Sequence, residues 1–156
     1  MKRNVKTLIV SLAVPLFVGA LSAWLTRGSM ERFEQMNEPP LSPPGWLFPV
    51  VWTILFLLMG AASWIVATSS AGLQEKKAAL RIYVLQLAVN FFWSILFFNL
   101  GFCVVAFVWL LLLMFLVLVT ALRFYRIEQL AGCLLIPYLL WIAFAGYLNL
   151  SICLLN

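Results

Sequence analysis

The sequence predicts an all-α membrane protein, a bundle of five transmembrane helices, and two observations carry this prediction. First, 65% of the residues are hydrophobic and only 10% are charged, whereas about 25% of a soluble domain is charged. Second, residues 82–122 form a run of 41 residues without a charged side chain. One helix over this run would be about 60 Å long, about twice the thickness of a bilayer's hydrocarbon core. The run therefore predicts two helices, joined by a turn at residues 99–101.

Three further runs, residues 7–26, 39–73 and 129–156, also lack charge. The first follows basic residues but is longer than the apolar stretch of a signal peptide, about 7–15 residues, so we interpret it as a mature helix. The second begins with prolines, which places the start of its helix near Gly45. The predicted spans are residues 7–26, 45–68, 79–99, 102–122 and 129–153, in one domain over residues 1–156.

The basic residues of alternate loops predict the orientation in the membrane. Eight lie on the side of the N-terminus and two on the other side: Lys2, Arg3, Lys6, Lys76, Lys77, Arg81, Arg123 and Arg126 against Arg27 and Arg32. Positively charged loops face the cytoplasm, which places the N-terminus in the cytoplasm and the C-terminus outside. Topology thus accounts for the net charge of +5, and no nucleic-acid partner is expected. We expect the cytoplasmic membrane of a bacterium, since the pattern is clean and no transit peptide is recognisable.

The composition excludes several kinds of chemistry. The sequence contains no histidine and no aspartate, so neither a histidine-ligated metal or haem site nor a Ser-His-Asp triad is expected. Apart from Arg81 at the start of the third predicted span, no Asp, Glu, Lys, Arg or His lies within a span, which counts against an ion channel or a proton-coupled transporter. A binder of an apolar or aromatic molecule, or a scaffold, remains. Cys103, Cys133 and Cys153 are odd in number and lack metal-binding spacing, so we expect three free, buried cysteines.

The proline-rich segment of residues 38–45 predicts a stiff loop between the first two spans. Two interpretations stay open: a lid over the bundle, or an ordinary interfacial loop with Trp46 at the level of the lipid headgroups.

Aromatic and amide side chains recur at helical spacing on three spans, so each set shares one helix face. The three sets are Phe48, Trp52 and Phe56; Gln86, Asn90, Trp93 and Phe97; and Pro137, Trp141, Ala145 and Asn149. Facing one another, they would form an aromatic-walled cavity for a flat, conjugated or sterol-like molecule. From spacing alone, helix packing through rings and amides is the simpler explanation. Gly19 and Ala23 on the first span suit close helix contact, within one chain or in a dimer.

Three motifs along the chain resemble those of the TspO/MBR family of translocator proteins, also known as peripheral benzodiazepine receptors. Residues 43–60 read PPGWLFPVVWTILFLLMG and resemble the family pattern PPxxxFxxVWTxLYxLMG. Residues 86–93 read QLAVNFFW and resemble QLxLNxxW, while residues 137–149 read PYLLWIAFAGYLN and resemble PYLxWxxFAxxLN. The resemblance covers essentially the whole chain, with the motifs in the family's order and spacing.

The resemblance implies a five-helix bundle, often a homodimer, that binds porphyrins such as protoporphyrin IX, and in many members sterols or synthetic drugs. It also implies light-dependent porphyrin degradation in some bacterial members through two tryptophans that match Trp52 and Trp141. It favours ligand binding over packing for the candidate site residues: Phe33, Phe48, Trp52, Phe56, Gln86, Asn90, Trp93, Trp141 and Ala145.

The chain departs from the family pattern at several positions. Phe33 and Phe56 stand where the pattern has tyrosines, and Glu38 stands where it has a lysine. No Lys or Arg follows Tyr147, so the sterol-recognition pattern of animal members is incomplete and high-affinity cholesterol binding is not expected.

The leading hypothesis is a tetrapyrrole-binding membrane protein that senses, sequesters or photochemically degrades a metal-free porphyrin, with no resident cofactor. Catalysis is not the first expectation, because no general acid or base is visible in the pocket. The alternative is a transporter or regulatory partner for porphyrins, sterol-like molecules or other small apolar ligands.

Overall fold

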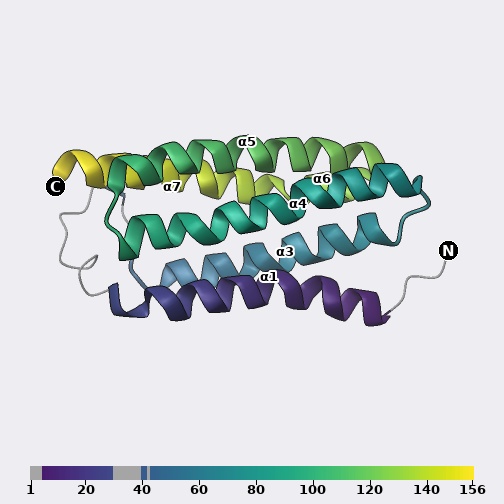
Figure 1. Cartoon of the computed structure of the whole chain (residues 1–156), viewed down its shortest axis with the longest axis horizontal. Coiled ribbons are helices and arrows are strands. Elements are labelled where there is room, and N and C mark those ends of the chain that lie inside the picture. The colour runs from purple at the N-terminus through teal and green to yellow at the C-terminus, as the bar shows by residue number, and fades with distance from the viewer. Residues whose placement is uncertain (1–4, 30–39, 42) are drawn as a thin grey trace.

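Five long helices lie side by side in the computed structural model, which describes residues 5–29, 40–41 and 43–156 (Figure 1). All five are long and apolar enough to cross a membrane, with 21 to 27 residues each. The elements are α1 (Val5–Thr26) with η1 (Arg27–Ser29), α3 (Leu47–Ala67), α4 (Leu73–Ser94) with η2 (Ile95–Asn99), α5 (Cys103–Ile127), α6 (Gln129–Cys133) and α7 (Ile136–Leu155). The predicted fold class, an all-α bundle of five membrane-spanning helices, is confirmed.

The turn between α4 and α5 lies where the sequence predicts it. The helical segment η2 ends at Asn99, and α5 begins at Cys103. Gly101 has a φ of 65°, a left-handed conformation that glycine adopts without the strain of a Cβ atom. Before the turn, the Leu100 amide donates to the Ile95 carbonyl at 3.0 Å, so the helix widens here into a π-type turn.

The fifth apolar segment is two helices rather than one continuous helix. The short helix α6 ends at Cys133, and α7 begins at Ile136 with Pro137 in its first turn. Proline has no amide hydrogen and disfavours a helical conformation of the preceding residue, so a helix starts at this position more easily than it passes through. Close to the break, a Cβ atom on Gly132 would lie 2.7 Å from the Tyr125 Cα, so only glycine allows α6 to approach α5 this closely.

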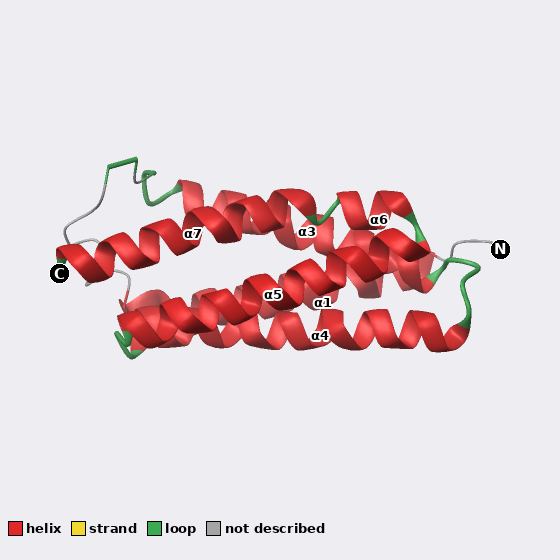
Figure 2. Ribbon diagram, turned by 90° about the horizontal axis from the view of Figure 1, so that it is seen from above, coloured by secondary structure: helices red, strands yellow, loops and turns green. Residues whose placement is uncertain are grey.

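Two layers of helices are visible in Figure 2: α3, α6 and α7 lie along one side, and α1, α4 and α5 along the other. The backbones of α1 and α3 pack closely, as do those of α4 with α5 and of α5 with α7. Gly19 of α1 faces the ring of Phe56 on α3, where a Cβ atom would clash, so this glycine serves packing within the chain. Ala23 is exposed. The expectation of a dimer stays a prediction.

All described Lys and Arg residues except Arg27 gather at one end of the bundle, which we call the cationic end. Lys6 lies at the start of α1, Lys76, Lys77 and Arg81 at the start of α4, and Arg123 and Arg126 at the end of α5. At the opposite end, Arg27 lies 4.7 Å from the centre of the Trp24 ring, a cation–π contact. Helix α1 begins at the cationic end and α7 finishes at the opposite end, as an odd number of spans requires (Figure 1).

The prediction of three free, buried cysteines is wrong. Cys103 and Cys153 form a disulfide, and Cys133 is free and exposed. The partners are 50 residues apart in sequence, a separation that carries no pairing signal. They meet because α5 and α7 run antiparallel, which brings the first residue of α5 beside the last turn of α7. We call this end of the bundle, opposite the cationic end, the disulfide end.

Candidate functional site

Aromatic side chains bridge α3 and α7, whose backbones approach each other little. The ring centres of Trp52 and Trp141 are 6.4 Å apart, and their planes are nearly perpendicular. Phe48 contacts the Trp141 ring at 5.8 Å, and Phe56 stacks on Trp52 at 5.6 Å. Because residues 48, 52 and 56 recur at helical spacing, α3 presents all three rings to one side. The structure thus brings four predicted site residues into one aromatic cluster.

An apolar groove of about 400 Å³ runs along the same helix pair. Its lining is aliphatic and aromatic, with four residues from each helix: Val51, Ile54, Leu55, Leu58, Pro137, Leu140, Trp141 and Phe144. Trp141 belongs both to the groove and to the aromatic cluster. The outward side chains Ile54 and Leu140 are more than half exposed in the isolated chain, so the groove lies at a surface that a lipid bilayer would surround.

Trp141 also carries an unsatisfied donor. Its indole nitrogen is buried and has no hydrogen-bond partner within the described part of the chain. A buried N–H group without an acceptor costs about 1–3 kcal/mol. A guest molecule with an acceptor atom would remove this cost, so the unpartnered N–H favours a ligand over a purely structural role for this ring.

Gln86 and Asn90 of α4 are joined to the aromatic cluster through Tyr138 of α7. The Tyr138 hydroxyl donates to the Gln86 Oε1 at 2.7 Å and accepts from the Asn90 Nδ2 at 2.6 Å. All three side chains are buried, and the Tyr138 ring meets Trp52 edge-on at 6.2 Å. Tyr138 therefore connects the polar residues of α4 to the rings of α3.

Trp93 lies further toward the disulfide end and takes part in a separate set of contacts. Its indole N–H donates to the Asn149 Oδ1 at 3.1 Å, and its ring stacks on Phe97 at 5.5 Å. Ala145 is buried on α7, between Trp141 and Asn149 in the same helix stripe. The predicted stripe on α4 does face inward, but Trp93 is bonded to Asn149 rather than packed against Trp52 or Trp141.

Sequence reasoning missed Tyr138 and Asn149 as candidate site residues. Both lie within the recognised motif of residues 137–149, and Asn149 also belongs to the α7 stripe. The available signal was physical: a tyrosine hydroxyl or an amide within an apolar span must find a hydrogen-bond partner on another helix. For Tyr138, the amide side chains of Gln86 and Asn90 in the motif of residues 86–93 were the obvious partners.

Of the proline-rich segment, residues 40–41 and 43–45 are described, whereas Glu38, Pro39 and Ser42 lie outside the described residues, as does Phe33. The Tyr147 hydroxyl donates to the Pro40 carbonyl at 2.7 Å, which ties the loop to α7, and the Leu47 amide donates to the Pro44 carbonyl at 3.0 Å. Trp46 is exposed. The lid therefore stays a prediction.

The cluster and groove can hold a guest by stacking and by shape. The described residues include no group of three His, Cys, Asp or Glu side chains that could hold a metal ion. The groove lining contains no charged side chain. A conjugated, mainly apolar molecule fits such walls, with the Trp141 N–H as an orienting donor.

Comparisons with known proteins relate the whole chain to one family. The model of the TspO/MBR family matches residues 11–155. A "Tryptophan-rich protein TspO" of Chlorobaculum tepidum is 35% identical over 157 residues, which cover 100% of this chain and 99% of that protein. A "Translocator protein" of Bos taurus is 37% identical, over 87% of this chain and 82% of that protein. A "Tryptophan-rich sensory protein" of Cereibacter sphaeroides is 33% identical, over 90% and 89%.

Proposed function

This chain belongs to the TspO/MBR family, and we propose that it binds a planar tetrapyrrole such as protoporphyrin IX between α3 and α7. It is an integral, multi-pass membrane protein. The observation that carries the proposal is the pair of Trp52 and Trp141, 6.4 Å apart beside an apolar groove of about 400 Å³. Ligand sites commonly measure about 300–1,000 Å³ and have mainly apolar walls with few polar groups.

The chemical character of a porphyrin matches the character of the residues that line this site. The macrocycle is flat and conjugated, so it stacks on indole and phenyl rings, and its π face can accept the Trp141 N–H. Its propionates are charged and would stay at an aqueous end, because the groove offers no cation to pair with them. Since the sequence has no histidine for an axial ligand, a metal-free porphyrin suits the site better than haem.

A titration of the porphyrin Soret band tests this assignment. We expect Trp52→Phe/Trp141→Phe to bind protoporphyrin IX at least tenfold more weakly than the wild type, because both indoles and the Trp141 donor are lost. Trp64→Phe is the matched control: it carries the same exchange on α3, twelve residues from Trp52. Equal affinity of the double variant and the control would overturn the site.

Light-dependent degradation of the bound porphyrin is the second candidate function. The edge-to-face Trp52–Trp141 pair favours it, since indoles that contact an excited macrocycle can donate electrons to it. Illumination at equal porphyrin occupancy should bleach the Soret band faster with the wild type than with Trp52→Phe/Trp141→Phe. Equal rates would leave binding, for sensing or sequestration, as the function. A transporter remains the alternative, which vectorial porphyrin uptake into reconstituted vesicles would reveal.

We also propose that the cationic end faces the cytoplasm of a bacterial cell. The segregation of Lys and Arg to this end supports the orientation. Cys133 is exposed near this end and is free, whereas Cys103 and Cys153 are paired. Cys133 lies within the apolar segment of residues 129–155, so Lys77→Cys in a Cys133→Ala background, at the charged and exposed start of α4, is the better probe. A membrane-impermeant maleimide should label this variant only after the membrane is permeabilised, and labelling in sealed spheroplasts would contradict the orientation.

A further inference from the structure

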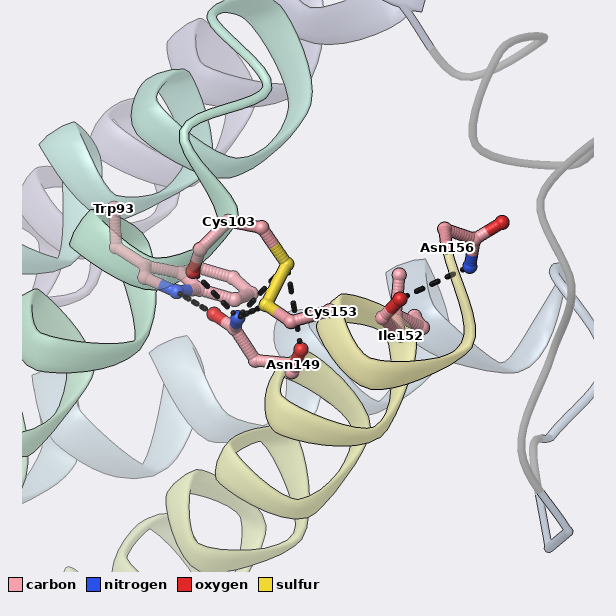
Figure 3. The surroundings of a disulfide bond; sticks show 6 residues. All are labelled: Trp93, Cys103, Asn149, Ile152, Cys153 and Asn156. Carbon is pink, nitrogen blue, oxygen red and sulfur yellow. Dashed lines mark hydrogen bonds between the residues drawn. A yellow bond between two sulfur atoms is a disulfide. The ribbon is translucent and has the colours of Figure 1, made fainter.

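At the disulfide end, the side chain of Asn149 lies against both halves of the disulfide (Figure 3). Its Nδ2 donates to the Cys103 carbonyl at 3.0 Å, and lies 3.5 Å from the Cys153 Sγ and 3.7 Å from the Cys103 Sγ. The Cys103 Sγ is also 3.5 Å from the Asn149 carbonyl oxygen. A disulfide sulfur has no proton to donate, so this last approach is a packing contact.

The other end of the same amide holds Trp93. The Asn149 Oδ1 accepts the Trp93 indole N–H at 3.1 Å, and both side chains are buried. An indole N–H can only donate and a backbone carbonyl can only accept. The amide therefore has one satisfied orientation, with its oxygen toward Trp93 and its nitrogen toward Cys103, and a flipped amide would lose both bonds.

We propose that Asn149 is a positioning residue for Trp93 and that the Cys103–Cys153 disulfide holds it in place, so that reduction of the disulfide loosens this end of the pocket. The effect on a ligand rests on the proposed function, while the effect on Trp93 does not. Without the covalent bond, the start of α5 can move away from α7, and the Cys103 carbonyl that fixes the amide moves with it.

The reduction is a thiol–disulfide exchange with a dithiol. One thiolate of the dithiol attacks a cysteine sulfur, the S–S bond breaks, and a mixed disulfide forms. The second thiolate then displaces the protein sulfur. Cys103 and Cys153 leave as two thiols with two protons and two electrons gained, and the dithiol becomes a disulfide.

The position of the disulfide in the bundle agrees with such a role. The positive-inside pattern predicts that the disulfide end lies outside the cytoplasm. Disulfides form and persist in oxidising compartments such as the bacterial periplasm, whereas the cytoplasm keeps thiols reduced. Charge and cysteine pairing are independent features, and both place the same end of the bundle in the same compartment.

Trp93 is coupled to the rest of the site through α4. It follows Asn90 by three residues on the same buried face, and Asn90 is bonded to Tyr138, whose ring contacts Trp52. A shift of Trp93 thus acts on the α4 wall of the proposed pocket.

Thiol counting and indole NMR on the ligand-free protein form the first test. Protein isolated without reductant should react with one maleimide, at Cys133, and with three after treatment with dithiothreitol. The Trp93 indole ¹⁵N–H resonance, assigned through Trp93→Phe, should shift on reduction in the wild type and in Cys133→Ala. In Cys103→Ala/Cys153→Ala it should start at the reduced position and not respond. The Trp109 indole, which donates to the Val89 carbonyl at 2.7 Å, should stay unchanged throughout.

Titration with protoporphyrin IX is the second test. Reduction should weaken binding by the wild type and by Cys133→Ala about two- to tenfold, the equivalent of one lost hydrogen bond. Asn149→Leu should bind as weakly as the reduced wild type and ignore dithiothreitol. Three reactive thiols before reduction, or an unmoved Trp93 resonance, would overturn the positioning role. A moved resonance with unchanged affinity would overturn the link to the ligand. If no form binds the porphyrin, the proposed function fails, while the resonance still decides the role of Asn149.

Discussion

Helix α7 meets its neighbours in two contrasting ways. Toward α4 and α5 it is held by directional bonds: Tyr138 to Gln86 and Asn90, Asn149 to Trp93, and the Cys103–Cys153 disulfide. Toward α3 it is met only by rings and an apolar groove, and the Trp141 N–H there has no partner among the described residues. One face of α7 fixes the fold, and the other is the face at which we propose that a guest binds.

This difference follows from the physics of a membrane interior. Lipid tails are as apolar as leucine, so hydrogen bonds and close packing rather than the hydrophobic effect hold helices together there. Ring contacts, in contrast, tolerate several geometries. A guest can therefore replace the contacts between α3 and α7 without breaking a directional bond, which is not true of the α4 side.

Removal of the disulfide should cause the largest loss of stability. It joins residues 50 positions apart, and loss of such a link costs about 2–4 kcal/mol in soluble proteins. Cys103→Ala/Cys153→Ala should therefore unfold at clearly lower denaturant concentration in detergent micelles. Cys133→Ala is the matched control and should unfold like the wild type. Identical unfolding of all three proteins would contradict the view that the disulfide holds α7 against α5.

Tyr138→Phe should have the next largest effect. It deletes one hydroxyl that makes two hydrogen bonds and leaves Gln86 and Asn90 buried without it. Bonds between membrane helices average about 0.6 kcal/mol each, so we expect a loss of about 1–2 kcal/mol in the free energy of unfolding. Tyr147→Phe, which loses a bond to the Pro40 carbonyl at an exposed position, should cost less. A larger loss of stability for Tyr147→Phe than for Tyr138→Phe would contradict the view that the buried bonds to α4 hold α7 in place.

We expect the smallest effects on stability, and the sharpest contrast, from a Trp→Phe exchange at each of the two contact regions of α7. Trp93→Phe breaks the bond to Asn149 and should cost about 0.6 kcal/mol. Trp141→Phe removes an N–H that has no partner and should leave stability unchanged or slightly raised. Unfolding of the two variants side by side measures the contrast, and a larger loss for Trp141→Phe would erase it.

Much of this organisation is visible in the sequence. Uncharged runs predict the five helices, Gly101 marks a turn that requires positive φ, and helical spacing places Gln86, Asn90 and Trp93 on a buried face. These features are local, since each depends on residues within a few turns of one another. Across lipid, uninterrupted apolar runs of this length satisfy their backbone N–H and C=O groups within helices.

Other features depend on how the helices are arranged and escape sequence reasoning. The pairing of Cys103 with Cys153 exists only once α5 and α7 lie antiparallel with their ends level. The division of the candidate residues between two faces of α7, with Trp141 toward α3 and Asn149 toward Trp93, likewise requires the helix order in space. Tyr138 could have been found from its hydroxyl, which an apolar span cannot leave unpaired.

The central claim, that the guest lies between α3 and α7, is tested most directly by indole NMR with protoporphyrin IX. The chain has seven tryptophans, and each indole N–H resonance can be assigned through its Trp→Phe variant. A porphyrin ring current shifts only protons close to the macrocycle. We predict the largest shifts at Trp52 and Trp141, a smaller shift at Trp93, and none at Trp24 or Trp64. Largest shifts at Trp24 or Trp64, with Trp52 and Trp141 unmoved, would contradict the account.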